Sequence, residues 1–117
     1  IQYLLDTDQP VHLSAIAAPV SAFEGIVPPV ELAVEQEKRV TEQIHALTRT
    51  AREDNDFAAE QFMQWFIKEQ VEEVATMQDL LAVVRRSEDD LNAIEAYVER
   101  DLAATGPDAA APKQAGA

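Results

Sequence analysis

The fold of this chain is decided by residues 57–86, which read FAAEQFMQWFIKEQVEEVATMQDLLAVVRR. Apolar side chains recur in this stretch at the spacing of one face of a helix. Two polar residues, Gln70 and Glu73, fall within that apolar face. The pattern predicts a helix from Phe57 to about Arg86, roughly 45 Å long at about 1.5 Å per residue. Its apolar face consists of Ala59, Met63, Phe66, Met77, Leu81 and Val84.

A second long helix is predicted over residues 28–53. Pro28 and Pro29 open it, because proline is well tolerated in the first turn of a helix. Residues 54–56 (Asp-Asn-Asp) supply the turn and the N-cap of the next helix. Glu37 falls inside the apolar face, and a carboxylate facing a core is costly unless it is paired, protonated or bound to a cation. The apolar face consists of Val30, Ala33, Val34, Val40, Ile44, Leu47 and Ala51.

The N-terminal segment predicts the end of a helix followed by a long connection. Residues 1–6 keep helical spacing, which suggests the last turns of a helix whose beginning is absent from this sequence. Residues 7–27 contain Pro10, Pro19 and Gly25 and show no sustained period. A connection of that length in a helical protein is expected to be a crossover that runs along a bundle.

The C-terminal part predicts a short helix and a tail. Ser87 and Asp90 are expected to cap a helix over residues 87–102, and residues 103–117 are rich in Ala, Pro and Gly and are expected to be disordered. With no strand alternation, the chain is predicted to be all-α. Each long helix has an apolar face wide enough to need further helices, from a missing portion or from other copies. The stripe of the short helix is Leu91, Ile94, Val98 and Leu102.

Composition excludes several classes of function. The 117 residues suit one domain, and the absence of cysteine excludes disulfides, thiolate catalysis and cysteine zinc sites. The net charge of −13 argues against nucleic acid and favours cations. Residues 1–6 do not resemble a signal peptide, and no apolar run approaches the roughly 20 residues of a membrane helix. The chain is therefore expected to be soluble and cytoplasmic, with no membrane partner.

Glu37 and Gln70 are the first candidates for metal ligands. Adjacent helices that both present oxygen atoms inward are how helical bundles build internal metal sites. The alternative is that each polar residue only fixes the register of the helix pair. Carboxylate and amide oxygens suit hard cations such as iron, manganese or magnesium.

An acidic run surrounds Gln70. Glu69 lies three residues before Glu72 and four before Glu73, so like charges repel by a few tenths of a kcal/mol in a free helix. A bound cation would reverse the sign of that interaction. The alternative is a solvated acidic face, on which Glu72 is expected to point outward.

Four other residues are weaker candidates. Glu42 and His45 match the Glu-x-x-His pattern of di-iron helical proteins. At ~100° per residue they lie roughly 140° and 80° from Glu37 around the helix, so both miss the apolar face. Trp65, one turn before Glu69, is either a packing residue at the flank of the bundle or a neighbour of a redox metal. His12, in the crossover, is expected at the surface.

Two segments carry a family resemblance: VEQEKRVT (residues 34–41) and EQFMQWFIKEQVEE (residues 60–73). With them, the sequence resembles the C-terminal two-thirds of a bacterial non-haem ferritin subunit. The resemblance implies a ferritin-like domain over residues 1–102, an N-terminally incomplete four-helix bundle with a long crossover and a short fifth helix. Residues 1–6 then end the second helix, and the later helices become the third (28–53), fourth (57–86) and fifth (87–102).

The resemblance also implies a function. Glu37 and Gln70 would line one iron position of a di-iron ferroxidase centre, and Glu69 and Glu73, together with Glu72, would match an accessory third iron site. Glu60 would lie near three-fold pores that admit Fe²⁺. Proteins of this family are expected to form shells of 24 copies that oxidise Fe²⁺ with dioxygen or peroxide and store the mineral.

The sequence departs from the family pattern in one respect. The first two helices of the family carry a Glu, a bridging Glu and its partner His, and none of them is present here, so the chain holds about half of a ferroxidase centre. Two rival hypotheses stay open. One is a structural helical oligomer without metal chemistry, and the other is a half-ferritin that dimerises to complete its site with Glu42 and His45.

Overall fold

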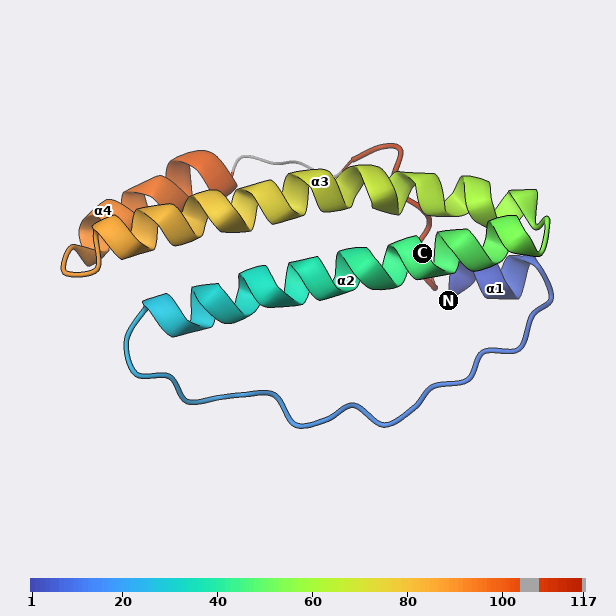
Figure 1. Cartoon of the computed structure of the whole chain (residues 1–117), viewed down its shortest axis with the longest axis horizontal. Coiled ribbons are helices and arrows are strands. Elements are labelled where there is room, and N and C mark those ends of the chain that lie inside the picture. The colour runs from blue at the N-terminus through green and yellow to red at the C-terminus, as the bar shows by residue number, and fades with distance from the viewer. Residues whose placement is uncertain (104–107, 117) are drawn as a thin grey trace.

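The computed structural model describes residues 1–103 and 108–116, and within these ranges all regular structure is helical, as predicted. Figure 1 shows two long antiparallel helices side by side, with a short helix against each end of the pair. The π-helical turn η1 continues the last of these helices. The elements are α1 (Gln2–Asp6), α2 (Val27–Glu53), α3 (Phe57–Arg86), α4 (Leu91–Tyr97) and η1 (Val98–Leu102).

The hairpin between α2 and α3 is built as its residue types suggest. Asn55 adopts φ 58°, a left-handed conformation that asparagine tolerates better than most residues. Asp56 is the N-cap of α3, and its carboxylate accepts a hydrogen bond of 2.9 Å from the Ala59 N–H. This tight turn fixes the two long helices as antiparallel neighbours.

The last helix begins later than the sequence predicted. Ser87 ends α3, where its N–H donates to the Val83 carbonyl, and Asp90 caps α4 by accepting from the Ala93 N–H at 3.1 Å. The two intervening residues, Glu88 and Asp89, form a turn rather than the first turn of the helix. Asp90 is the N-cap because its carboxylate accepts a hydrogen bond from an otherwise free N–H in the first turn of α4.

The expected disordered tail, residues 103–117, falls partly outside the described residues, since 104–107 and 117 are not described. Residues 108–116 return along α3, where Asp108 accepts a hydrogen bond from Trp65. The returning segment contains no helix.

The buried seam between α2 and α3 differs from the predicted apolar face. Val40 and Leu47 are 36% and 58% exposed, although both were predicted to face the core. Two threonines replace them at the seam, because the residues that face α3 follow a spacing of three and four along α2. The seam side of α2 carries Val34, Glu37, Thr41, Ile44, Thr48 and Ala51.

The apolar core lies at one end of the molecule. Val83, Val84 and Ile94 are buried together where α4 folds back on the end of α3. Residues at the start of α2 and on the facing helices pack around them: Ile26, Val27, Val30, Leu80 and Tyr97. This end is the hydrophobic anchor of the helix pair.

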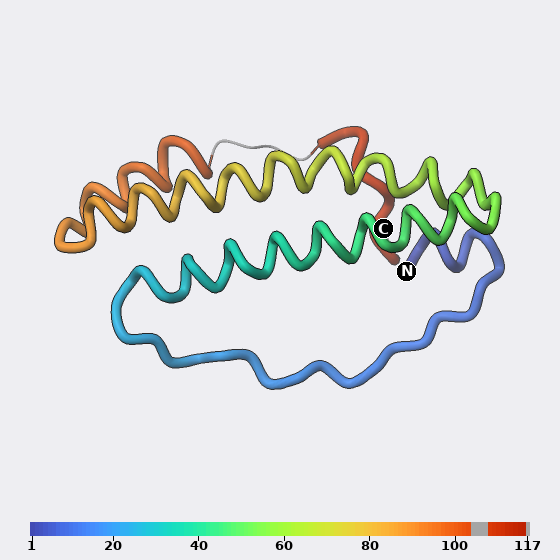
Figure 2. Tube along the Cα trace, in the orientation of Figure 1, coloured from blue at the N-terminus to red at the C-terminus, as the bar shows by residue number. Residues whose placement is uncertain are grey.

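The crossover, residues 7–26, joins α1 to the start of α2 without any helix. Figure 2 shows its trace running the whole length of the α2–α3 pair. α1 is held at the hairpin end, where the Tyr3 ring stacks on the Phe62 ring with centroids 4.1 Å apart. No helix in the described ranges is both long and apolar enough to cross a membrane.

Candidate metal centre

Gln70 and Glu37 meet in the middle of the α2–α3 seam. Gln70 is 7% exposed, and its Nε2 donates to Glu37 Oε2 at 3.2 Å and to the Glu37 backbone carbonyl at 3.1 Å. The same Nε2 lies 3.1 Å from Thr41 Oγ1, which in turn donates to the Glu37 carbonyl at 2.8 Å. We call Glu37, Thr41 and Gln70 the polar node. The structure therefore brings together the two residues that the sequence singled out.

The polar node follows from the local sequence of α2. Glu37 and Thr41 are one turn apart, so they share the face that carries Val34 and Ile44. Threonine bonds back to the carbonyl four residues earlier, which tethers its hydroxyl inside the seam. Gln70 reaches this group from α3 and is the bridge between the helices.

The polar node carries a carboxylate, a hydroxyl and an amide, and the nitrogen of that amide, rather than its oxygen, faces Glu37. The Gln70 Nε2 donates its hydrogen bonds to residues of α2, and no described residue donates to the Gln70 Oε1. No buried side-chain nitrogen or oxygen in the described ranges lacks a partner, so that Oε1 is not sealed in. One carboxylate, one hydroxyl and one amide oxygen suit a hard cation.

Sequence reasoning missed Thr41 and Thr48. Both lie on the seam, and Thr48 is buried with its hydroxyl donating to the Ile44 carbonyl of its own helix at 2.8 Å. The signal was available, because Thr41 is four residues after Glu37 and Thr48 four after Ile44. A search for apolar residues alone passes over threonine, whose hydroxyl can be satisfied within the helix.

The acidic run on α3 lies on another face of the helix. Glu69 is half-buried, whereas Glu72 and Glu73 are exposed. Glu72 therefore points outward as predicted, but Glu73 does not face the core as its place in the apolar stripe had suggested. The three line one side of an open hollow of about 540 Å³, together with Asp101 and Asp108.

The described residues do not supply a complete set of protein metal ligands. Within residues 1–103 and 108–116, no three His, Cys, Asp or Glu side chains are grouped so that they could hold a metal ion. The polar node has one carboxylate, and the acidic run spreads its carboxylates around an open hollow. Neither group by itself therefore brings together three such ligands within the described residues.

Trp65 packs against a neighbouring aromatic ring and donates a hydrogen bond to the C-terminal segment. Its ring meets the Phe66 ring edge-on, with centroids 4.9 Å apart, and its Nε1 donates to Asp108 Oδ2 at 2.9 Å. The hydrogen bonds from the Ala110 N–H and from Trp65 hold the pKa of Asp108 below its usual value. The indole is therefore tied to the C-terminal segment.

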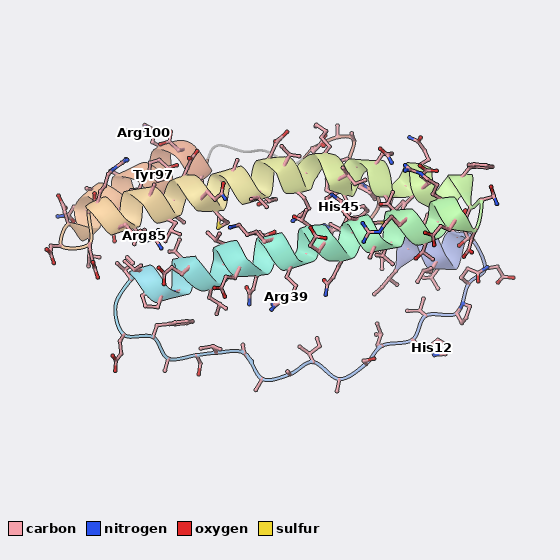
Figure 3. All side chains as sticks on the ribbon, viewed as in Figure 1. His12, Arg39, His45, Arg85, Tyr97 and Arg100 are labelled. Atoms are coloured by element: carbon pink, nitrogen blue, oxygen red, sulfur yellow. The ribbon has the colours of Figure 1, made fainter. Side chains whose placement is uncertain are left out.

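The remaining candidates lie apart from the polar node. Glu60 accepts from Arg52 Nε at 2.9 Å and Nη2 at 2.6 Å, which ties the start of α3 to the end of α2. Glu42 is exposed and His45 is half-buried. Figure 3 places His12 on the crossover, away from His45 on α2.

The chain is similar to known proteins along nearly its whole length. Residues 1–87 match the family model described as the ferritin-like domain. "Ferritin BfrB" of Mycolicibacterium smegmatis is 45% identical over 99% of this chain and 64% of its own length. A "bacterial non-heme ferritin" of Staphylococcus epidermidis is 35% identical over 87% of this chain and 61% of its own length.

Solved structures agree with the sequence relatives. An open-pore ferritin from the archaeon Archaeoglobus fulgidus superposes with a TM-score of 0.78 at 30% identity, covering 90% of this chain and 64% of that one. The chain thus spans just under two thirds of the length of the relatives it matches. The helical hairpin, the long crossover and the family match together place this chain in the ferritin family, with a ferritin-like helical fold.

Proposed function

We propose that this chain is part of an iron-storage protein that binds Fe²⁺, oxidises it at a di-iron ferroxidase centre and stores Fe³⁺ mineral inside a hollow shell of 24 copies. The observation that carries the proposal is the contact between Glu37 Oε2 and Gln70 Nε2, at 3.2 Å, in a seam whose other buried residues are mostly apolar. Iron is the substrate and the stored product. The protein is proposed to work in the cytoplasm.

The chemistry of the polar node fits one half of an iron position. The Glu37 carboxylate neutralises charge, and a turn of the Gln70 amide would present its oxygen in place of its nitrogen. Because Gln70 is neutral, it binds iron more weakly than a second carboxylate would, which favours release of the oxidised product. These residues position Fe²⁺, and the metal supplies the redox chemistry with dioxygen or peroxide.

Further ligands must come from helices outside the described set. Val40 and Leu47 are exposed on α2 although apolar, so that face suits packing against additional helices. Those helices belong either to the same natural polypeptide or to another copy. In either case they would have to bring at least two more carboxylate or histidine ligands to the polar node.

Two acidic features are proposed to assist. Glu69 and Glu73, with Glu72, form an accessory iron site beside the hollow on α3, and Glu60 lies near a pore between copies. The net charge of −13 attracts Fe²⁺ to the protein. In this structure Glu60 is paired with Arg52, so it acts in iron transfer only if that pair opens.

The test is an anaerobic Fe²⁺ titration, followed by oxidation on addition of dioxygen, of the natural polypeptide that carries this sequence. The double variant Glu37→Ala/Gln70→Ala is expected to lose roughly tenfold or more in affinity at the ferroxidase position and most of the fast oxidation phase. The matched control Glu35→Ala/Gln64→Ala removes the same two residue types at exposed positions of the same helices. It is expected to behave as wild type.

Two results would favour the rival hypotheses. Unchanged binding and oxidation in the Glu37→Ala/Gln70→Ala variant would favour a structural helical oligomer, in which the polar node only sets register. Loss of oxidation in His45→Ala, with the fold intact by circular dichroism, would favour a half-ferritin completed by Glu42 and His45 of a second copy.

A further inference from the structure

The C-terminal segment forms a strap, which we define as residues 108–116. It folds on itself at Asp108, whose Oδ1 accepts from the Ala110 N–H at 2.8 Å and whose carbonyl accepts from the Ala111 N–H at 3.1 Å. Asp108 Oδ2 accepts from Trp65 Nε1 at 2.9 Å. In the described ranges, this is the one side-chain hydrogen bond between the strap and a helix.

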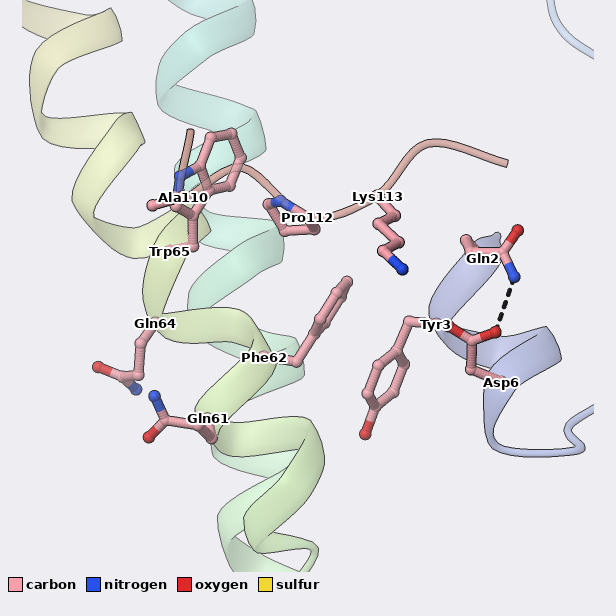
Figure 4. Close-up of a pocket in the computed structure, with 10 residues that line it drawn as sticks. All are labelled: Gln2, Tyr3, Asp6, Gln61, Phe62, Gln64, Trp65, Ala110, Pro112 and Lys113. Carbon is pink, nitrogen blue, oxygen red and sulfur yellow. Dashed lines mark hydrogen bonds between the residues drawn. The ribbon is translucent and has the colours of Figure 1, made fainter. Parts of the chain in front are cut away.

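The strap forms a wall of two hollows, with Trp65 between them. One, of about 450 Å³, is lined by Tyr3 and Phe62 and is closed on one side by Pro112 and Lys113 (Figure 4). The other, of about 540 Å³, joins the acidic run of α3 to the strap residues Asp108, Ala111 and Gln114. The strap thus forms part of the wall of the acidic hollow.

The strap is held by few contacts. Of its described side chains, only Pro112 is partly buried, and the rest are exposed. Segments with few buried apolar contacts open at low free energy, well below global unfolding. A single hydrogen bond can therefore decide whether such a segment rests on the helix.

The Asp108 carboxylate lies in an acidic part of the surface and is held there by hydrogen bonds. Glu69, Glu72, Glu73 and Asp101 line the same hollow as Asp108, and Lys68 attracts the Asp108 carboxylate. Two N–H donors, from Ala110 and Trp65, hold the carboxylate in place. Removing the indole donor leaves nothing in the described part of α3 that bonds the strap directly.

We propose that residues 108–116 act as a lid that closes on α3 through the hydrogen bond from Trp65 Nε1 to Asp108 Oδ2 and limits access to the hollow lined by Glu69, Glu72 and Glu73. A role for this lid in iron handling rests on the proposed function. The closure itself does not, and it can be tested without iron.

Acrylamide quenching of Trp65 fluorescence tests the lid, because Trp65 is the one tryptophan in the sequence. In Asp108→Ala the strap loses its latch, and the quenching constant is expected to rise by about twofold or more. The matched control is Asp101→Ala, which removes a carboxylate from the same hollow but leaves the latch intact, since Asp101 pairs with Arg100. It is expected to quench as wild type.

Unchanged quenching in Asp108→Ala would overturn the lid, and so would an equal rise in both variants, because loss of charge would then explain it. A second measurement uses Trp65→Phe, which keeps an aromatic ring but removes the indole N–H. Amide hydrogen exchange at Ala110 and Ala111 is expected to accelerate several-fold in this variant. Exchange at the wild-type rate would also overturn the proposal, whatever the outcome of the iron titration.

Discussion

The α2–α3 seam has two regions of opposite chemistry. At one end, Val83 and Val84 of α3 form an apolar cluster with Ile94 of α4, against which the start of α2 packs, and Val84 is 1% exposed. At mid-length, the polar node places a carboxylate and an amide in the same seam. Both regions join α2 to α3. Comparing them therefore separates the contacts that stabilise the hairpin from the polar contacts that its stability does not explain.

The two regions contribute to the free energy of unfolding through different interactions, apolar burial at one end and hydrogen bonds at the polar node. Burial of apolar surface contributes about 25 cal/mol per Å² and is the main source of stability at the apolar end. A hydrogen bond exchanges water for a protein partner and contributes only about 1 kcal/mol net, which the desolvation of Glu37 and Gln70 offsets. The apolar end therefore anchors the hairpin, whereas the polar node contributes little to its stability.

The largest expected effect on stability is at the apolar end. Val84→Ala removes two methyl groups from a filled site, and the free energy of unfolding is expected to fall by about 2 kcal/mol. Val71→Ala is the matched control, since Val71 lies on the same helix but is 70% exposed, and it is expected to change stability by less than about 0.5 kcal/mol. Urea unfolding followed by circular dichroism measures both. Equal losses would remove the distinction between the two regions.

A smaller effect on stability is expected at the polar node. Gln70→Leu loses the hydrogen bonds to Glu37 and Thr41 but gains apolar burial, so unfolding is expected to change by no more than about 1 kcal/mol. Fe²⁺ affinity in the natural polypeptide is expected to fall roughly tenfold. Urea unfolding and anaerobic titration of the same preparation separate the two effects. A large loss of stability with unchanged affinity would make the polar node a structural device.

The smallest effect is expected at Thr48, a buried polar residue in the same seam that does not reach across it. Its hydroxyl is satisfied by the Ile44 carbonyl, so Thr48→Val is expected to change stability by less than about 0.5 kcal/mol and leave Fe²⁺ binding unchanged. Thermal unfolding and the same titration test this. A clear loss of iron binding would show that polarity anywhere in the seam matters, rather than the contact between Glu37 and Gln70.

The helical plan was predictable because its signals are local. Each signal acts within a few residues. These signals are the prolines at the start of α2, the Asn-Asp turn before α3 and the helical spacing of the apolar residues. The start of α4 was misplaced by four residues because Ser87 and Asp90 both have the chemistry of a cap. Only the hydrogen bond from Ala93 decides between them.

The pairing of Glu37 with Gln70 was predictable in part, because both interrupt apolar stripes on consecutive helices. The role of Thr41 was not predicted, because its contribution depends on the rotation of α2 against α3. Glu73 was misassigned for the same reason, since a small rotation of a helix carries a side chain from the seam to the solvent. The contact between Trp65 and Asp108 joins residues 43 positions apart, and no local pattern signals it.

The most direct test of the central claim is a crystal structure of the natural polypeptide loaded anaerobically with Fe²⁺, with anomalous scattering recorded at the iron absorption edge. The account expects an anomalous peak within bonding distance of the Glu37 carboxylate and Gln70 Oε1, with the Gln70 amide turned from the orientation seen here. Iron bound elsewhere in the same crystal, with Gln70 Nε2 still donating to Glu37 and no peak beside them, would contradict it.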